Sequence, residues 1–167
     1  MCRSIHGCDM FKMTGNRCIF HRNNAGCDEI GNHNTRMFKK LTCPASWSPM
    51  NEICYLQTKQ KEYCANIQNT CLSHGGNAAE FYSKEEMTNS LTVITSNVYV
   101  SGRLQGGVYL WNVTGQQIDT SLWIPNEPAE GDCVQIWKAN KGLDALSGFH
   151  FMTVLCEQVN DLSNVKQ

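Results

Sequence analysis

The sequence predicts a disulfide-rich α+β fold, and three observations support this prediction. Ten cysteines occur in 167 residues, a density that indicates a disulfide framework formed in an oxidising compartment rather than free thiols. Two segments with helical periodicity come before residue 97, and several short β-branched or aromatic runs follow it. The hydrophobic fraction of 41% is sufficient for the core of one domain.

Two helices are expected in the first half of this domain. Residues 58–74 carry apolar side chains at helical spacing, with Thr58 as the N-cap and Gly75-Gly76 as the stop. The second helix begins with Ser83-Lys84-Glu85-Glu86, a capping box in which the Ser83 hydroxyl and the Glu86 carboxylate accept from backbone amides. Its apolar stripe is Met87, Leu91 and Ile94.

Strands are expected after residue 97. The runs 98–100, 108–111, 134–137 and 152–155 are short and rich in Val, Ile, Tyr and Trp. Asn112-Val113-Thr114-Gly115 separates the second run from the next and predicts a turn. The same residues form an N-glycosylation sequon, so Asn112 is the expected glycosylation site of a secreted protein.

The cysteine distribution predicts how the chain is divided. Residues 1–31 form a segment with Cys2, Cys8, Cys18 and Cys27, residues 32–42 are polar and read as a linker, residues 43–160 form the folded domain, and 161–167 form a tail. Met1 is followed directly by Cys2 and Arg3 without an apolar leader, which conflicts with secretion. We therefore expect the chain to be a fragment or a processed form of a secreted protein.

Charge and motifs argue against several classes of function. With 14 basic and 15 acidic residues the formal net charge is −1, so a nucleic-acid partner is not expected. Neither is membrane insertion, because no apolar run approaches about 20 residues. The sequence lacks Cys-x-x-Cys, His-Glu-x-x-His and Gly-x-Ser-x-Gly motifs, so we expect neither a zinc protein nor an enzyme.

Residues 43–158 contain an ordered series of motifs. They are Cys43-Pro44 with Trp47, Cys54-Tyr55, Cys71-Leu72-Ser73-His74-Gly75-Gly76, Tyr109-Leu110-Trp111-Asn112, Trp123-Ile124-Pro125-Asn126-Glu127-Pro128, Gly131-Asp132-Cys133-Val134 and Leu155-Cys156-Glu157. This series resembles the C-type lectin-like domain. The resemblance implies a double-loop fold of two helices, two small antiparallel sheets and a long irregular loop, at about 121–146, that carries the ligand contacts.

The resemblance also implies disulfides. The expected pairs are Cys43–Cys54 and Cys71–Cys156. The next-to-last cysteine of the family, expected near Leu146 or Ser147, is absent, which leaves Cys133 without its usual partner. Cys64 is surplus and replaces that partner, or Cys64 or Cys133 pairs with the N-terminal segment. That segment resembles the closing half of a PAN/apple module, or it is a disulfide-tied extension without its own function.

Calcium-dependent members of the family bind sugar through carboxylate and amide oxygens of the long loop, and the carried-over positions are incomplete here. Glu127 and Asp144 match metal ligands, but Ala129 and Leu143 stand where amides belong. Because calcium needs six to eight oxygens, calcium is not an expected cofactor and the metal site is expected to be degenerate. Asn126, Glu127, Glu130, Asp132 and Asp144 are the candidate ligand-binding residues. The alternative is that these acids are solvated loop residues inherited with the scaffold.

The expected function is recognition by a secreted, extracellular protein. Its ligand would be a carbohydrate or glycoprotein bound through the long loop, weakly dependent on calcium or independent of it. The alternatives are a protein–protein recognition module without sugar binding and a structural or adhesive matrix component. Trp111, Trp123 and Trp137 are expected in the core rather than as a sugar-stacking platform. The ligand's identity and the oligomeric state cannot be derived from the sequence.

Overall fold

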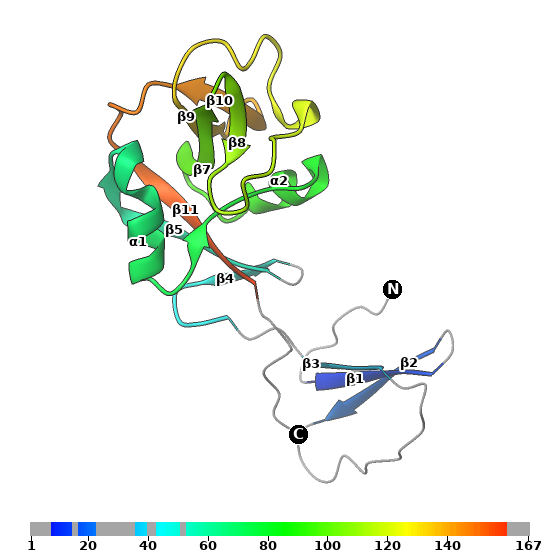
Figure 1. The fold of residues 1–167 in the computed structure, drawn as a ribbon. Helices are drawn as coiled ribbons and strands as arrows, with labels where there is room; N and C mark the ends of the chain where they lie inside the picture. Colours follow the sequence, from blue (N-terminus) through cyan, green and yellow to red (C-terminus); the bar gives the residue numbers. More distant parts are fainter. Residues whose placement is uncertain (1–7, 15–16, 23–35, 40–42, 51–52, 160–167) are drawn as a thin grey trace. The chain divides into compact units, whose positions relative to one another are not determined.

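A computed structural model describes residues 8–14, 17–22, 36–39, 43–50 and 53–159. The chain divides into two compact units, Met1–Thr42 and Cys43–Gln167 (Figure 1). Cys2, Cys27 and the tail 161–167 lie outside the described residues, as does the pairing of the four N-terminal cysteines. Within the described part of the chain, no helix is long and apolar enough to cross a bilayer.

The first unit contains a three-stranded antiparallel sheet in the order β2-β1-β3. Its strands are β1 (Cys8–Thr14), β2 (Arg17–Arg22) and β3 (Arg36–Lys39). Strand β3 falls inside residues 32–42, the segment expected to be a linker. The polar neighbours of β3 concealed this strand, whose four residues pair with β1 from Met10↔Lys39 to Met13↔Arg36.

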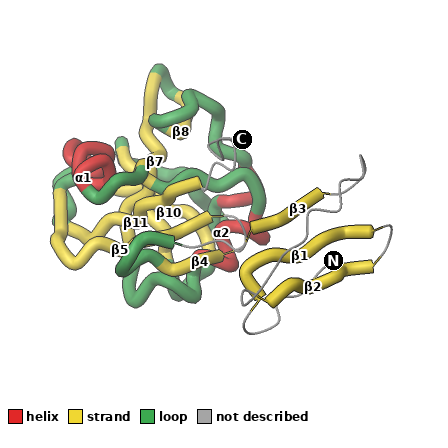
Figure 2. The backbone as a smooth tube through the Cα atoms, turned by 90° about the horizontal axis from the view of Figure 1, so that it is seen from below, coloured by secondary structure: helices red, strands yellow, loops and turns green. Residues whose placement is uncertain are grey.

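The second unit is an α+β domain. Its elements in chain order are β4 (Ser48–Met50), β5 (Ile53–Glu62), η1 (Cys64–Asn66), α1 (Ile67–Ser73), β6 (Asn77–Ala78), α2 (Lys84–Ser90), β7 (Val98–Gln105), β8 (Val108–Trp111), η2 (Thr120–Leu122), β9 (Cys133–Trp137), β10 (Gly142–Leu146) and β11 (Met152–Val159). The helices α1 and α2 lie on either side of the strands (Figures 1 and 2). The four expected strands are present, and β4, β5, β6 and β10 are additional.

The strands form one continuous sheet in the order β10-β9-β7-β11-β5-β4, with β6 paired to β11 and β8 to β7. Two antiparallel sets, as expected, are joined by a parallel contact between β11 and β7 at Val154↔Tyr99. Large apolar side chains from both sets are buried around this junction, among them Trp111, Phe81, Met87, Ile136 and Leu155. The junction therefore lies at the centre of the core.

The helix expected at 58–74 is shorter than predicted. Residues up to Glu62 belong to β5, and only Ile67–Ser73 is α-helical. Thr58 is not an N-cap: its buried hydroxyl donates to Gln60 O (2.7 Å) and accepts from Val154 N (2.9 Å). Pairing with β11 decides the conformation of this polar segment, because cross-strand bonds outweigh weak local helix propensity.

The second helix begins as predicted. The Ser83 hydroxyl accepts from Glu86 N at 3.1 Å, and a Glu86 carboxylate oxygen accepts from the backbone N–H of Tyr82 at 2.9 Å. The Glu86 carboxylate of the capping box therefore accepts from the amide of Tyr82, one residue before the N-cap residue Ser83. Met87 is buried in the helix, but Leu91 and Ile94 follow its end at Ser90. The predicted stripe thus continues into the turns after α2.

Three disulfides are described in the second unit. Cys43–Cys54 and Cys71–Cys156 confirm the two pairs implied by the resemblance. Cys64–Cys133 forms the third, which resolves the alternatives left open for these two cysteines. The two long-range bridges close loops over sequence separations of 69 and 85, and in the entropic model such loops each stabilise the fold by about 4–5 kcal/mol.

A cluster of carboxyl groups lies near β11 and the turn after β8, with Glu80 buried and Glu157 half-buried. Glu80 is almost fully buried and accepts from Ser101 Oγ, Val113 N and Thr114 Oγ1, each at 2.8 Å. Burial raises the pKa of Glu157 to about 8; the backbone N–H of Glu80 opposes this shift, and the charges of Glu80 and Glu86 add to it. Glu157 is therefore protonated in the fold at neutral pH, unlike a solvated glutamate.

We predict that the free energy of unfolding decreases as pH rises from about 5 to 9. A carboxyl group whose pKa is raised in the fold ionises there at a cost that the unfolded chain does not have, so stability is lost on going up through the folded pKa. The expected loss exceeds about 1 kcal/mol. Chemical unfolding at stepped pH values measures it.

The variant Glu157→Gln should flatten this dependence, since the amide does not ionise. Glu85→Gln is the matched control, because Glu85 is exposed in the first turn of α2. Equal pH dependence in the wild type and Glu157→Gln would contradict the assignment.

Candidate functional site

The long loop runs from η2 to β9 and is the yellow segment at the top of Figure 1. It is shorter than the expected range of 121–146, because β9 and β10 form a paired hairpin over Cys133–Leu146. The irregular part, residues 123–132, contains a cis peptide at Glu127–Pro128 and a positive φ of 70° at Asn126. Residues 133–136 and 142–146 are consequently buried in the sheet, whereas most residues of the hairpin turn between them are exposed.

Glu127 connects this loop to the hairpin. Its Oε2 atom accepts from the backbone N–H of Ala129 at 2.9 Å and from that of Ala145 at 3.1 Å. The first bond closes a turn within the loop, and the second attaches the loop to β10. The carboxylate therefore has a structural role, since it satisfies two backbone donors that would otherwise lack partners.

Asp144 lies on β10 and points into the same region. It is buried, and its Oδ2 accepts from the Gln135 side chain at 2.5 Å. Burial raises the pKa of Asp144, and the charge of nearby Glu127 adds to the shift, while the Gln135 bond opposes it. The structure therefore brings Glu127 and Asp144 together, and both carboxyl groups are bonded to the protein.

The remaining calcium positions do not supply oxygen. Leu143 has 0% exposure and belongs to the core, and Ala129 is exposed. Within residues 43–50 and 53–159, no group of three or more His, Cys, Asp or Glu side chains is placed to hold a metal ion. A calcium ion needs six to eight oxygens, so these residues do not fit a family-type calcium site.

The other three candidate residues are not part of this cluster. Asn126, Glu130 and Asp132 are exposed on the loop. Asp132 Oδ1 accepts from Gly148 N at 2.7 Å, which attaches the end of the loop to the segment between β10 and β11. The exposed polar groups of the loop are thus Asn126, Glu130 and part of Asp132.

The aromatic and glycosylation predictions have different outcomes. Trp111 and Trp123 are buried, whereas Trp137 is 38% exposed at the end of β9 and is not a core residue.

Asn112, the expected glycosylation site, is exposed on the predicted turn. Gly115 closes this turn with a positive φ of 73° and a hydrogen bond from its N–H to Trp111 O (2.8 Å).

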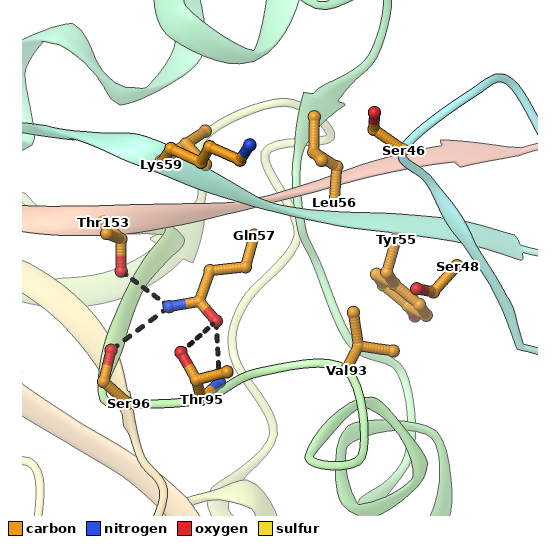
Figure 3. Close-up of a pocket in the computed structure, with 11 residues that line it drawn as sticks. Ser46, Ser48, Tyr55, Leu56, Gln57, Lys59, Val93, Thr95, Ser96 and Thr153 are labelled. Carbon is orange, nitrogen blue, oxygen red and sulfur yellow. Dashed lines mark hydrogen bonds between the residues drawn. The ribbon is translucent and has the colours of Figure 1, made fainter.

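A hollow that sequence reasoning missed is lined by residues of β4, β5, β11 and the turn after α2. Its cavity volume is about 470 Å³, and Figure 3 shows Gln57 at its base. The Gln57 amide donates to Ser96 Oγ (3.1 Å) and Thr153 Oγ1 (2.9 Å) and accepts from Thr95 N (2.7 Å). These bonds join β5, β11 and the turn, so we assign Gln57 a structural role.

Comparison with known proteins relates the second unit to C-type lectin-like domains. No family model matches the chain. It is 29% identical to a type-2 ice-structuring protein of Hemitripterus americanus over 89 residues, or 52% of this chain and 53% of that protein. A type-2 ice-structuring protein of Brachyopsis segaliensis is 25% identical over 59% of this chain and 60% of its own. The chain thus spans between half and three fifths of the curated relatives it matches.

Solved structures show the same fold at low identity. A calcium-independent type II antifreeze protein superposes with a TM-score of 0.64 at 22% identity over 71% of this chain and 95% of its own. The cow C-type carbohydrate-recognition domain of CD23 gives 0.62 at 21% identity, covering 71% and 96%. These likenesses establish the C-type lectin-like fold. Neither comparison shows a PAN/apple module in residues 1–31.

We predict that restoring the two missing amides does not restore a calcium site. Leu143→Asn places a polar amide in the core and should reduce the free energy of unfolding by about 2–5 kcal/mol. Ala129→Asn lies on the exposed loop and should change it by less than about 0.5 kcal/mol. Chemical unfolding of each single variant, with and without calcium, measures both effects.

The double variant tests the same point more severely. A calcium-dependent gain in its stability would show that Glu127 and Asp144 can turn from their internal bonds toward a metal. That result would contradict the structural role assigned to them.

Proposed function

We propose that the chain is a secreted recognition protein that binds a carbohydrate or glycoprotein ligand without requiring calcium. The observation that supports this most strongly is the orientation of Glu127 and Asp144, whose carboxyl groups are bonded to Ala129 N, Ala145 N and the Gln135 amide. These bonds hold both carboxyl groups against the protein, and Ala129 and Leu143 add no side-chain oxygen, so the shell of six to eight oxygens that calcium needs is incomplete. The proposed role is binding rather than catalysis, with glycosylation at Asn112.

The surface offered to the ligand is the exposed part of the long loop. Asn126 and Glu130 are exposed there, and the internal bonds of Glu127 hold the loop backbone in place. An amide and a carboxylate can each bond a sugar hydroxyl directly. A loop fixed before binding loses little conformational entropy when the ligand arrives.

A second candidate function is ice binding. Both curated relatives are named as ice-structuring proteins, and one structural neighbour is described as a calcium-independent type II antifreeze protein. This candidate shares the absence of a calcium requirement with the first. It differs in its ligand, so thermal hysteresis measured on the same preparation separates the two: a freezing-point gap that grows with protein concentration would support ice binding.

For the first candidate, we predict binding to an immobilised glycan panel with affinities that agree within about twofold in calcium and in chelator, because no bound cation is required. The oxidatively folded full chain is the material to use. Glu130→Gln should weaken the interaction, whereas Glu85→Gln, an exposed glutamate on α2, should leave it unchanged.

Two results would change the assignment. Signal lost in chelator would mean that a working cation site exists despite Ala129 and Leu143. Absence of signal in both buffers would reject the glycan ligand and favour ice or an extracellular protein partner.

A further inference from the structure

The segment between β10 and β11 exposes aromatic side chains that the core does not use. Phe149 is 90% exposed and Phe151 54% exposed, and Tyr63 beside the start of η1 is 51% exposed. The rings of Tyr63 and Phe151 lie 5.1 Å apart between centroids at an interplanar angle of 48°. We call Tyr63, Phe149 and Phe151 the aromatic patch.

The backbone beneath this patch is fixed at several points. The buried Tyr99 donates its hydroxyl to His150 O at 3.0 Å, Gly148 N donates to Asp132 Oδ1 at 2.7 Å, and Cys64 N donates to Gly148 O at 3.4 Å. A Cβ atom at Gly148 would lie 3.1 Å from Cys133 Sγ, so the segment rests directly on the Cys64–Cys133 disulfide. Phe149 is thus exposed on an anchored backbone rather than on a loose one.

Polar groups lie next to the aromatic patch. The carboxylate of Asp132 lies close to Gly148, the residue before Phe149: a Cβ atom added to Gly148 would be within 3.3 Å of both carboxylate oxygens. Asp132 is exposed, and so is His150 between the two phenylalanines. Because Asp132 also ends the long loop, the patch is continuous with the surface on which the proposed function depends.

The size of the patch indicates a small ligand. With aromatic side chains of 150–250 Å² each and the exposed fractions above, the three rings offer on the order of 400 Å². A stable protein interface buries about 800 Å² on each partner, so a globular partner would have to contact a comparable area of the polar surface around the three rings as well. One or two sugar rings require much less.

We propose that the aromatic patch is a stacking platform for a pyranose ring, with Asp132 accepting a hydroxyl hydrogen at its edge. One face of many pyranoses carries several C–H groups, which are attracted to the electron-rich face of an aromatic ring, while the ring's hydroxyls need polar partners. This inference rests on the proposed function and specifies it: the ligand class is a pyranose with an apolar face. The contact lies at the Asp132 end of the loop rather than at Glu127 and Asp144.

The test uses the full chain in chelator with four methyl glycosides, those of galactose, glucose, mannose and N-acetylglucosamine, followed by NMR. In the wild type we expect saturation to pass from aromatic ring protons to C–H protons on one face of at least one glycoside. Phe149→Ala should weaken binding of that glycoside about tenfold. Phe149→Tyr, which retains a ring, should bind within about twofold of the wild type.

Leu72→Ala is the matched control, because Leu72 is an exposed apolar residue on α1, outside the patch. Trp137→Ala tests another exposed aromatic side chain, at the end of β9. Both should bind like the wild type. A glycoside bound equally by the wild type, Phe149→Ala and Phe151→Ala would overturn the platform but leave the proposed function intact. Absence of binding of every glycoside to the wild type, together with a silent glycan panel, would overturn both.

Discussion

The domain depends on the position of strand β11 at the centre of its sheet. Its backbone pairs with β5, β6 and β7, and Cys156 on it is linked to Cys71 on α1. This strand comes last in the chain, whereas most of its partners come early, so the central contacts are long-range. Elements with little propensity of their own, such as the polar half of β5, take their conformation from this pairing. The sheet around β11 is thus a frame for the loops, and the Cys71–Cys156 disulfide joins it covalently to α1.

The candidate site shows what this frame does to residues that could otherwise bind a metal. Asp144 is held within a strand and faces the Gln135 amide of the neighbouring strand, while Glu127 accepts from a backbone N–H of that same hairpin. Because Leu143, the neighbour of Asp144 on this hairpin, belongs to the core, the hairpin cannot present an oxygen shell without losing apolar contacts. Glu127 and Asp144 would have to leave these bonds to bind calcium, and the bonds of Glu127 are also the ones that hold the loop in place.

The sequence predicted the parts of the structure that local pattern determines. Residue type and order predicted the strand runs after residue 97, the capping residue Ser83 and the turn at Asn112–Gly115. The resemblance to the C-type lectin-like domain implied the disulfide pairs Cys43–Cys54 and Cys71–Cys156. Three other features depend on tertiary contacts that a one-dimensional pattern does not contain: the strand at Thr58, the hairpin strand β10 and the exposure of Trp137. The site divides in the same way, since its acidic residues could be listed but the direction of each carboxylate could not. The aromatics of Phe149-His150-Phe151 drew no prediction, because residue type alone does not show that the rings are exposed.

The bridge between Cys64 and Cys133 has a consequence for how this domain can vary. The family pattern places a cysteine near Leu146 or Ser147, within the connection before β11, whereas here both bridging sulfurs belong to neighbouring elements beneath that connection. The side chains at positions 149–151 therefore take part in no disulfide. The backbone of this connection is held instead by hydrogen bonds from Tyr99 and to Asp132. Substitution at these positions changes the chemistry of the surface without loosening the support. The scaffold can thus acquire a new specificity by point mutation at a cost in stability far below that of altering a bridged loop.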